Sequence, residues 1–305
     1  MLDFTVVVPV YNGGDIWRQS IRSILDQDIA PQKVVVIDSS STDDSASLAI
    51  DAGFCVKTIE KSDFDHGGTR SAALQFVDTE IVIFMTQDAI LDSPSAFRRM
   101  LDIFRNQNVS AAYGRQLPHY DANPLAKYAR QNSYGAQGYV TSIEDDFPKG
   151  FRKAFMSNSF AAYRVRDLTE LGAFPQKLIL GEDSYFTAKA LVAGKSAAYV
   201  ADAKVRHSHN YSVREEFKRY FDIGVFHSDQ SWMLEELGSV EGEGVRFAFG
   251  QIAFLLKQKH YFYLLMSIMT SAAKYLGYKL GRYHKSLPHS WSRRLSMYKS
   301  YWNHV

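Results

Sequence analysis

The chain has 305 residues, of which 46% are hydrophobic and 22% are charged, an ordinary balance for a globular protein of one large or two smaller domains. Its one cysteine, Cys55, excludes an intramolecular disulfide framework and fits a reducing compartment. The formal net charge of +2 is uneven along the chain, because residues 245–305 hold 10 of the 35 Lys and Arg side chains and none of the 33 acidic ones.

The first 110 residues alternate between apolar β-branched runs and amphipathic segments. The runs predict strands buried on both faces, and the segments between them predict helices. The predicted strands are Phe4–Val10, Lys33–Asp38, Phe54–Ile59 and Glu80–Met85, and the predicted helices are 14–27, a segment ending near 51, Thr69–Phe76 and 94–105. This alternation predicts an α/β fold with parallel strands joined by helices. No basic and apolar leader precedes the first strand, so we expect no signal peptide.

Polar residues follow the first two predicted strands, at the sheet edge where open α/β folds bind ligands. Pro9, Tyr11 and Asn12 end the first strand, where backbone groups can meet a planar base and a pyrophosphate. A simple turn is the alternative, because Pro and Asn are turn formers. Asp38 ends the second strand, where its carboxylate would accept from a base N–H or a ribose hydroxyl, or cap the next helix.

The run from Asp65 to Arg70, which reads Asp-His-Gly-Gly-Thr-Arg, is the sharpest local signal. Its two glycines allow a ligand to approach the backbone, and the helix that follows offers free N–H groups to an anion. Arg70 adds a guanidinium suited to phosphate oxygens. A helix start with a surface arginine is the alternative.

A single acid, Asp88, follows the predicted strand Glu80–Met85 in the sequence Thr86-Gln87-Asp88. A carboxylate at the end of a buried strand suits a hard divalent cation that bridges a diphosphate. Mg²⁺ needs only one or two carboxylates beside phosphates and waters, so one Asp suffices. A cap for the next turn is the alternative role of Asp88.

Beyond residue 110 the alternation is less regular. The predicted strands are Ala111–Tyr113, Ser157–Tyr163 and Ala197–Val205, followed by mostly helical chain beyond 212. Glu182 and Asp183 open a predicted helix that ends at Ala193, where acids gain from the helix dipole. As functional groups, one carboxylate would take a proton from an acceptor hydroxyl while the other orients the site.

His207 and His209 follow the last predicted strand and share one face of extended chain. One of them would complete a metal site. Two packed or exposed histidines are the alternative, since a His-x-His pair alone is not specific.

The most hydrophobic stretch is 252–273, but Lys257, Gln258, Lys259 and His260 interrupt it. A spanning helix needs ~20 mostly apolar residues, and a central lysine costs roughly 2.5–3.5 kcal/mol. We therefore expect interfacial amphipathic helices rather than a span, held at an anionic membrane surface by the basic and aromatic tail. Ordinary core helices are one alternative, and nucleic-acid binding by the tail is a weaker one.

The order of these segments resembles glycosyltransferase family 2, which has the GT-A fold, from residue 1 to about 215. The resemblance is closer still to bacterial rhamnosyltransferases that use dTDP-L-rhamnose, on the strings Phe64–Arg70, Thr86–Ala89, Ser157–Ser159 and Val205–Asn210. No G-x-G-x-x-G dinucleotide motif, P-loop or G-x-S-x-G elbow is present.

The resemblance implies a role for each matching position. Asp183 would be the general base, and Asp88 stands where the family's Asp-x-Asp metal motif ends, although Thr86-Gln87-Asp88 has only one acid. One of His207 and His209 would approach the metal or the diphosphate. The implied nucleotide-sugar-binding residues are Pro9, Tyr11, Asn12 and Asp38 on the nucleoside, His66 and Arg70 near the diphosphate, and Gln87, Asp88 and Glu182.

Taken with these features, the resemblance implies an inverting glycosyltransferase that uses Mg²⁺ or Mn²⁺ and moves L-rhamnose from dTDP-L-rhamnose to a lipid-linked saccharide in bacterial surface polysaccharide synthesis. We expect a GT-A domain over 1–215, with a nucleotide-binding half (1–110) and an acceptor half (111–215). A helical extension over 216–305 would attach it to the cytoplasmic, inner face of the cell membrane, and nucleic acid is not an expected partner. The alternatives are a same-fold transferase with a UDP-hexose donor and a non-catalytic nucleotide-sugar-binding scaffold.

Overall fold

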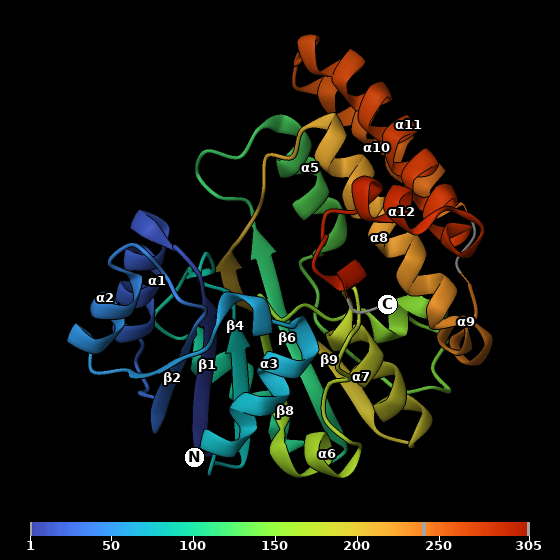
Figure 1. The fold of residues 1–305 in the computed structure, drawn as a ribbon. Helices are drawn as coiled ribbons and strands as arrows, with labels where there is room; N and C mark the ends of the chain where they lie inside the picture. Colours follow the sequence, from blue (N-terminus) through green and yellow to red (C-terminus); the bar gives the residue numbers. More distant parts are fainter. Residues whose placement is uncertain (1, 240–241, 304–305) are drawn as a thin grey trace.

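The computed structural model describes residues 2–239 and 242–303. Within these residues, nine strands form one sheet in the order β3-β2-β1-β4-β8-β6-β9-β5, with β7 paired to β9 (Figure 1). The strands are β1 (Phe4–Val10), β2 (Lys33–Asp38), β3 (Cys55–Thr58), β4 (Ile81–Met85), β5 (Ile90–Leu91), β6 (Val109–Leu117), β7 (Tyr139–Thr141), β8 (Phe160–Arg164) and β9 (Ser196–Arg206).

The sheet is parallel in its first half and mixed in its second. β1 to β4 run parallel, as the sequence predicts. β8 is antiparallel to both β4 and β6, and β9 is parallel to β6. The C-terminal ends of β1, β2, β4, β6 and β9 therefore share one sheet edge with the N-terminal end of β8.

Helices cover both faces of the sheet. They are α1 (Gly14–Leu25), α2 (Ser45–Asp51), α3 (His66–Ala73), α4 (Ala96–Asp102), α5 (Pro124–Ser133), α6 (Val165–Glu170), α7 (Glu182–Val192), α8 (Val213–Asp229), α9 (Ser231–Leu237), α10 (Glu243–Lys257), α11 (Phe262–Arg282) and α12 (His289–Leu295). Strand side chains alternate between two cores, so that Val6 and Val8 pack with α1, α2 and α4, while Val7 packs on the side of α3, α6, α7 and α8.

Two predicted boundaries differ from the structure. α3 begins at His66, three residues before the predicted start, because the Asp65 side chain caps the Gly68 N–H. The predicted domain boundary at 215 falls inside α8, whose Phe221 is fully buried in the second core. The helical C-terminal region therefore continues directly from the α/β part.

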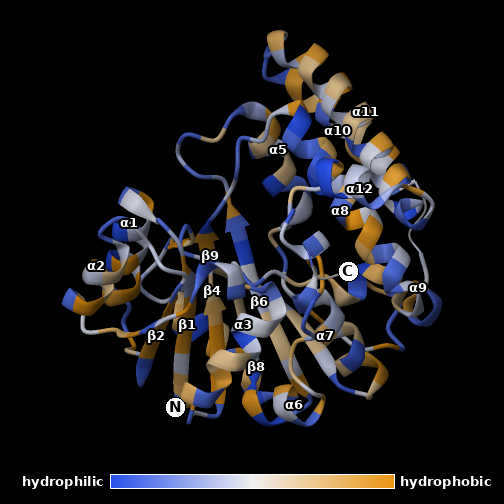
Figure 2. Cartoon of the chain, in the orientation of Figure 1, coloured by the Kyte–Doolittle hydropathy of each residue, from blue (hydrophilic) through white to orange (hydrophobic). Residues whose placement is uncertain are grey.

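The interrupted hydrophobic stretch forms two helices, α10 and α11, which project from the α/β body (Figure 1). None of the helices in the described residues has the length and apolarity needed to cross a bilayer. Large apolar side chains are nevertheless exposed on both helices, which alternate between hydrophobic and hydrophilic residues in Figure 2. The most exposed are Val245, Phe249, Phe262, Leu265, Ile268 and Tyr275.

Glycines bring α8 and α11 into direct backbone contact. A Cβ on Gly281 would collide with the Phe221 carbonyl, and one on Gly277 would collide with the Phe217 carbonyl. Gly224 on α8 faces α11 in the same way. The close crossing therefore requires small residues on both helices, and it fixes the position of α11 over α8.

We expect Gly281→Ala to lower the free energy of unfolding by ~1–3 kcal/mol, because the added methyl meets backbone that cannot turn away. Thermal unfolding followed by circular dichroism measures the change. Gly244→Ala in α10 is the matched control, because nothing lies within 4 Å of its Cβ and alanine favours the helix by ~0.5–1 kcal/mol. Equal stability of the two variants would contradict the close crossing.

Candidate active site

Three residues from two segments form a possible metal centre at the shared sheet edge. Asp88 follows β4, and His207 and His209 follow β9. Nε2 of His207 lies 3.4 Å from Asp88 Oδ2, and Nε2 of His209 lies 3.7 Å from the same oxygen. One ligand atom from each residue lies within 4.8 Å of the others. Sequence reasoning expected one of the two histidines here, and the structure brings both within reach.

Neighbouring groups prepare these side chains for a cation. The Gln116 amide donates to Ser157 Oγ at 2.8 Å and turns its Oε1 to His207 Nδ1 at 3.1 Å. Because that oxygen accepts, Nδ1 of His207 carries a proton, which leaves Nε2 as the nitrogen that faces Asp88 and can bind a metal. Two acceptors that face each other are satisfied by a cation between them, so the donor set fits a divalent metal.

The charge states of His209 and Asp88 agree with this fit. Burial, and then the nearby His207, lower the pKa of His209 to about 4, so its imidazole is neutral at pH 7. Burial opposes the ionisation of Asp88, but His207 and His209 still hold the pKa of its carboxyl well below the usual range. His209 therefore offers a neutral nitrogen and Asp88 a carboxylate at pH 7.

α7 delivers two acids to the same edge. The residue before the helix is Gly181, which has a positive φ of +81°. A Cβ at this position would also lie 2.9 Å from the Phe226 ring, so both the backbone conformation and the space favour glycine. Glu182 and Asp183 then occupy the first helical turn, where the helix dipole favours acids.

Asp183 is half-buried and held by two backbone N–H groups. Asn158 N donates to Oδ2 at 3.0 Å, and Ser184 N donates to Oδ1 at 2.7 Å. Burial, and then the charge of Glu182, raise the pKa of Asp183 to about 7. A carboxylate whose pKa is close to neutral pH is well matched to accept a proton in catalysis.

The segment Ser157–Ser159, just before β8, joins the two groups of residues. Asn158 contacts Asp183 through its backbone, and Ser159 Oγ lies 3.5 Å from His207 Nε2. Asp183 is therefore one short segment away from the possible metal centre and on the same side of the sheet.

The structure corrects the expected role of Arg70. Its side chain is 5% exposed, its Nη1 lies 3.1 Å from Glu182 Oε1, and the same nitrogen donates to the His66 carbonyl at 2.9 Å. Glu182 also accepts from Asn158 Nδ2 at 2.9 Å. The Arg70 guanidinium is therefore not free to bind phosphate; it instead holds Glu182 beside Asp183. Its charge also keeps the pKa of Glu182 low against the effect of burial.

The Gly-Gly turn before Arg70 also differs from its prediction. A Cβ on Gly67 would collide with the Pro175 carbonyl, and Asp65 occupies the Gly68 N–H. The glycines therefore permit tight packing rather than approach of an anion. His66 packs edge-on against Tyr298, with ring centroids 4.7 Å apart, so the C-terminal segment reaches this turn.

The predicted nucleoside residues lie at the ends of β1 and β2. Pro9 is inside β1, and Gln87 clamps the next turn by accepting from Tyr11 N at 2.7 Å and donating to Tyr11 O at 3.2 Å. Asn12 adopts a positive φ of 47° and accepts from Thr42 N at 2.8 Å. Gln87 therefore shapes the turn, and its amide is already used by the backbone.

Asp38 carries the clearest unused polar atom at this end of the sheet. The residue is 2% exposed, and its Oδ2 accepts from Ser41 N at 3.1 Å. Its Oδ1 is buried and has no hydrogen-bond partner. A buried carboxylate oxygen without a partner is costly, so a ligand donor here would be bound favourably.

Sequence reasoning missed two arginines beside the possible metal centre. Arg130 of α5 donates through Nε to the His207 carbonyl at 2.8 Å. Arg219 of α8 lies over the Tyr211 ring at 5.6 Å, and within residues 2–239 and 242–303 it has no carboxylate within ion-pair distance. Both charges act on His209. No local motif in the sequence marks either residue.

Comparisons with known proteins show the family of this chain and agree with its fold. The family model described as "Glycosyl transferase family 2" matches residues 5–172. The O-antigen chain rhamnosyltransferases WbaN of Salmonella anatum and RfbN of Salmonella typhimurium are each 46% identical to this chain over 100% of its length and 97% of theirs. The chain therefore belongs to glycosyl transferase family 2, and it is a glycosyltransferase.

Solved structures support the GT-A fold. A mannosyltransferase of Pyrobaculum calidifontis, in complex with GDP-Man and Mn²⁺, has a TM-score of 0.64 at 18% identity, covering 93% of this chain and 90% of its own. Residues 1–349 of TarS of S. aureus, in complex with UDP-GlcNAc, have a TM-score of 0.56 at 18% identity, covering 97% and 84%. These likenesses extend over the helical C-terminal region as well as the sheet.

Proposed function

We propose that this protein transfers L-rhamnose from dTDP-L-rhamnose to a hydroxyl of a lipid-linked saccharide during bacterial surface polysaccharide synthesis, with inversion at the anomeric carbon. The observation that carries the chemistry is the placement of Asp183 and the Asp88, His207 and His209 cluster on one sheet edge, joined by Ser157–Ser159. The sugar and the pathway rest on the full-length relatives named as O-antigen chain rhamnosyltransferases. The dTDP carrier rests on the sequence resemblance.

Asp183 supplies the base. Its carboxylate takes the proton of the acceptor hydroxyl, and the hydroxyl oxygen forms a bond to the anomeric carbon as the bond from that carbon to the diphosphate oxygen breaks. The nucleoside diphosphate leaves with the bonding electrons. Asn158 and Ser184 keep the carboxylate oriented, and Arg70 holds Glu182 at the distance that keeps the pKa of Asp183 near 7.

The departing diphosphate gathers negative charge beside Asp88, His207 and His209. A divalent cation bound by these residues would neutralise that charge as a Lewis acid. Two imidazoles beside one carboxylate favour Mn²⁺ over Mg²⁺, because Mg²⁺ prefers oxygen ligands. Arg219, which has no carboxylate partner among the described residues, and Arg130 add fixed positive charge at the same place.

We expect Asp38→Asn to weaken binding of dTDP by ~10-fold or more, because a hydrogen bond to a charged acceptor is worth ~1.5–3 kcal/mol. The amide must keep its oxygen towards Ser41 N, so its NH₂ faces the nucleoside and cannot accept from a base N–H or ribose hydroxyl. Titration calorimetry measures the dissociation constant. Asp51→Asn, on the exposed end of α2, is the control, and equal affinity in both variants would contradict this role for Asp38.

The exposed apolar side chains of α10 and α11 support the proposal that the enzyme works at the cytoplasmic face of the membrane. They form an unusual outward patch, and residues 245–305, which include these side chains, have ten basic and no acidic side chains. Apolar insertion and attraction to anionic lipid then act together, without a spanning helix.

A donor panel tests the proposed function. Binding and turnover are measured with dTDP-rhamnose, UDP-glucose, UDP-galactose and GDP-mannose, each with and without Mn²⁺ or Mg²⁺, and with a saccharide acceptor present. We expect transfer from dTDP-rhamnose only. Transfer from a UDP-hexose would replace the donor assignment, and tight binding of every donor without turnover would favour a non-catalytic scaffold.

A further inference from the structure

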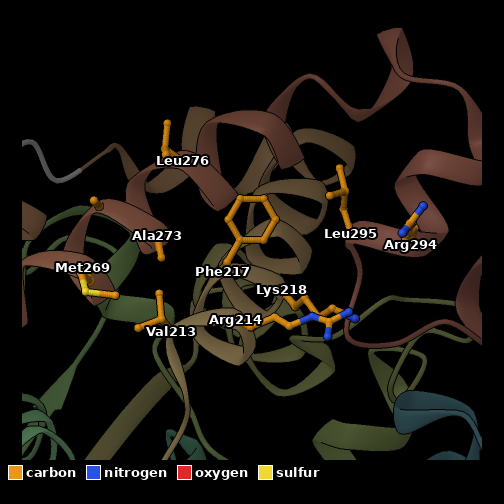
Figure 3. Close-up of a pocket in the computed structure, with 10 residues that line it drawn as sticks. Val213, Arg214, Phe217, Lys218, Met269, Ala273, Leu276, Arg294 and Leu295 are labelled. Carbon is orange, nitrogen blue, oxygen red and sulfur yellow. The ribbon is translucent and has the colours of Figure 1, made fainter. Parts of the chain in front are cut away.

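A groove of about 670 Å³ lies outside the catalytic centre, between α8, α11 and α12 (Figure 3). Its floor is apolar, with Phe217 of α8, Ala273 and Leu276 of α11, and Leu295 of α12 among its lining residues. The volume lies within the range of ~300–1,000 Å³ that is usual for small-molecule sites. An apolar floor of this size suits part of a long hydrocarbon chain.

Three cations line the same groove. Arg214 and Lys218 come from successive turns of α8 and run together along one side, and Arg294 comes from α12 (Figure 3). Within residues 2–239 and 242–303, none of the three has a carboxylate within ion-pair distance. Like charges that face an apolar surface repel one another, and an anion placed among them relieves this repulsion.

The surrounding acids do not neutralise these cations. Asp222, one turn after Lys218, already accepts from Met297 N at 2.9 Å and Tyr298 N at 3.1 Å. Glu216 pairs with Lys274 at 3.1 Å. The groove therefore combines an apolar floor with unpaired positive charge, which is the complement of an anionic lipid.

The groove adjoins the outward apolar patch, and its α8 side begins shortly after the metal-centre histidines in the chain. Met269 and Leu276 line it and are also 44% and 54% exposed on α11, so it opens onto the patch. Val213, another lining residue, begins α8 only four residues after His209, and the Tyr211 ring lies 5.0 Å from the His209 ring. A lipid in this groove therefore contacts the first turns of the helix that follows the metal-centre histidines.

We infer that this groove binds the lipid phosphate or diphosphate of the acceptor, with the chain on the apolar floor and the phosphates among Arg214, Lys218 and Arg294. The inference rests on the proposed function, which supplies a lipid-linked acceptor. A groove of this volume suits one bound lipid, whereas the exposed patch on α10 and α11 suits bulk phospholipid. The groove is therefore the acceptor's lipid site, and the patch is the membrane contact.

The test is calorimetric titration of the whole protein with farnesyl diphosphate, in the presence of saturating dTDP to occupy the donor site. We expect farnesyl diphosphate to bind at least tenfold more tightly than either farnesol or inorganic pyrophosphate, because both halves of the groove contribute. Arg214→Gln combined with Lys218→Gln is expected to weaken this binding at least tenfold. Ala272→Trp, which fills the groove from exposed α11 without a change of charge, is expected to do the same.

The matched control is Lys257→Gln combined with Lys279→Gln, which removes the same charge from exposed positions outside the groove. This variant should keep farnesyl diphosphate binding and lose affinity for phosphatidylglycerol vesicles. Equal loss of farnesyl diphosphate binding in both double variants, or equal binding of pyrophosphate alone, overturns the inference. Failure of the proposed function would appear separately, as absent transfer from dTDP-rhamnose to a soluble saccharide by the unaltered protein.

Discussion

Asp183→Asn is expected to reduce the rate of sugar transfer by ~10²–10⁴-fold, the usual contribution of a positioned general base. The amide keeps the size of the side chain but cannot take a proton. Binding of dTDP should change little, because Asp183 contacts Asn158 and Ser184 rather than the residues at the ends of β1 and β2. Steady-state kinetics and calorimetry on the same preparation separate the two effects.

The pH dependence identifies the group that is lost. Because burial and the charge of Glu182 raise the pKa of Asp183 to about 7, the base is protonated and inactive below that pH and ionised above it. The kcat/KM of the unaltered enzyme should therefore fall as pH decreases through about 7, and the residual activity of Asp183→Asn should lose this decrease. Asp202→Asn, on an exposed position of β9, is the control for the chemical change. Parallel loss of transfer and of dTDP binding would count against the role of Asp183.

Removal of the metal ligands is expected to have the second-largest effect. Asp88→Asn should reduce transfer by ~10²-fold or more, because a Lewis acid at the leaving diphosphate is worth several kcal/mol. Chelation with EDTA should give a similar loss in the unaltered enzyme, reversed by Mn²⁺. Isothermal titration with Mn²⁺ in the presence of dTDP measures the site directly.

A second variant tests how the site is held rather than which residues bind. Gln116→Ala removes the acceptor for His207 Nδ1, and we expect a 10–100-fold weaker affinity for Mn²⁺ that a higher metal concentration restores. His260→Gln, on an exposed position after α10, should behave like the unaltered enzyme. Full activity of Asp88→Asn in EDTA would show that transfer needs no metal at this place.

The sequence predicts well those features that depend on local pattern. The β-branched runs place β1, β2 and β4 within a residue, and the alternation with helices predicts their parallel order. Once the strands are parallel, polar residues at their C-terminal ends must share an edge, which is why Asp38 and Asp88 can be proposed as site residues before the structure is seen. His207 and His209 follow from the same argument, because β9 ends at that edge.

The features that sequence reasoning missed depend on contacts between distant residues. Arg70 looks like an anion binder because its partner, Glu182, is more than a hundred residues further along the chain. Gln116 reaches His207 only because β6 pairs with β9. The groove is formed by residues of α8, α11 and α12, so it exists only once these helices pack together. The glycines at the contact of α11 with α8 are visible in the sequence, but their spacing does not predict which helix they contact.

The most direct test of the account is a crystal structure with Mn²⁺ and dTDP, in which anomalous scattering locates the metal. We expect one strong peak between Asp88, His207 Nε2 and His209 Nε2, with the β-phosphate on it and the Asp183 carboxylate facing the space beyond that phosphate. A peak elsewhere, or a nucleotide whose diphosphate lies on the side of the sheet away from Asp183, would contradict a single catalytic centre built from these residues.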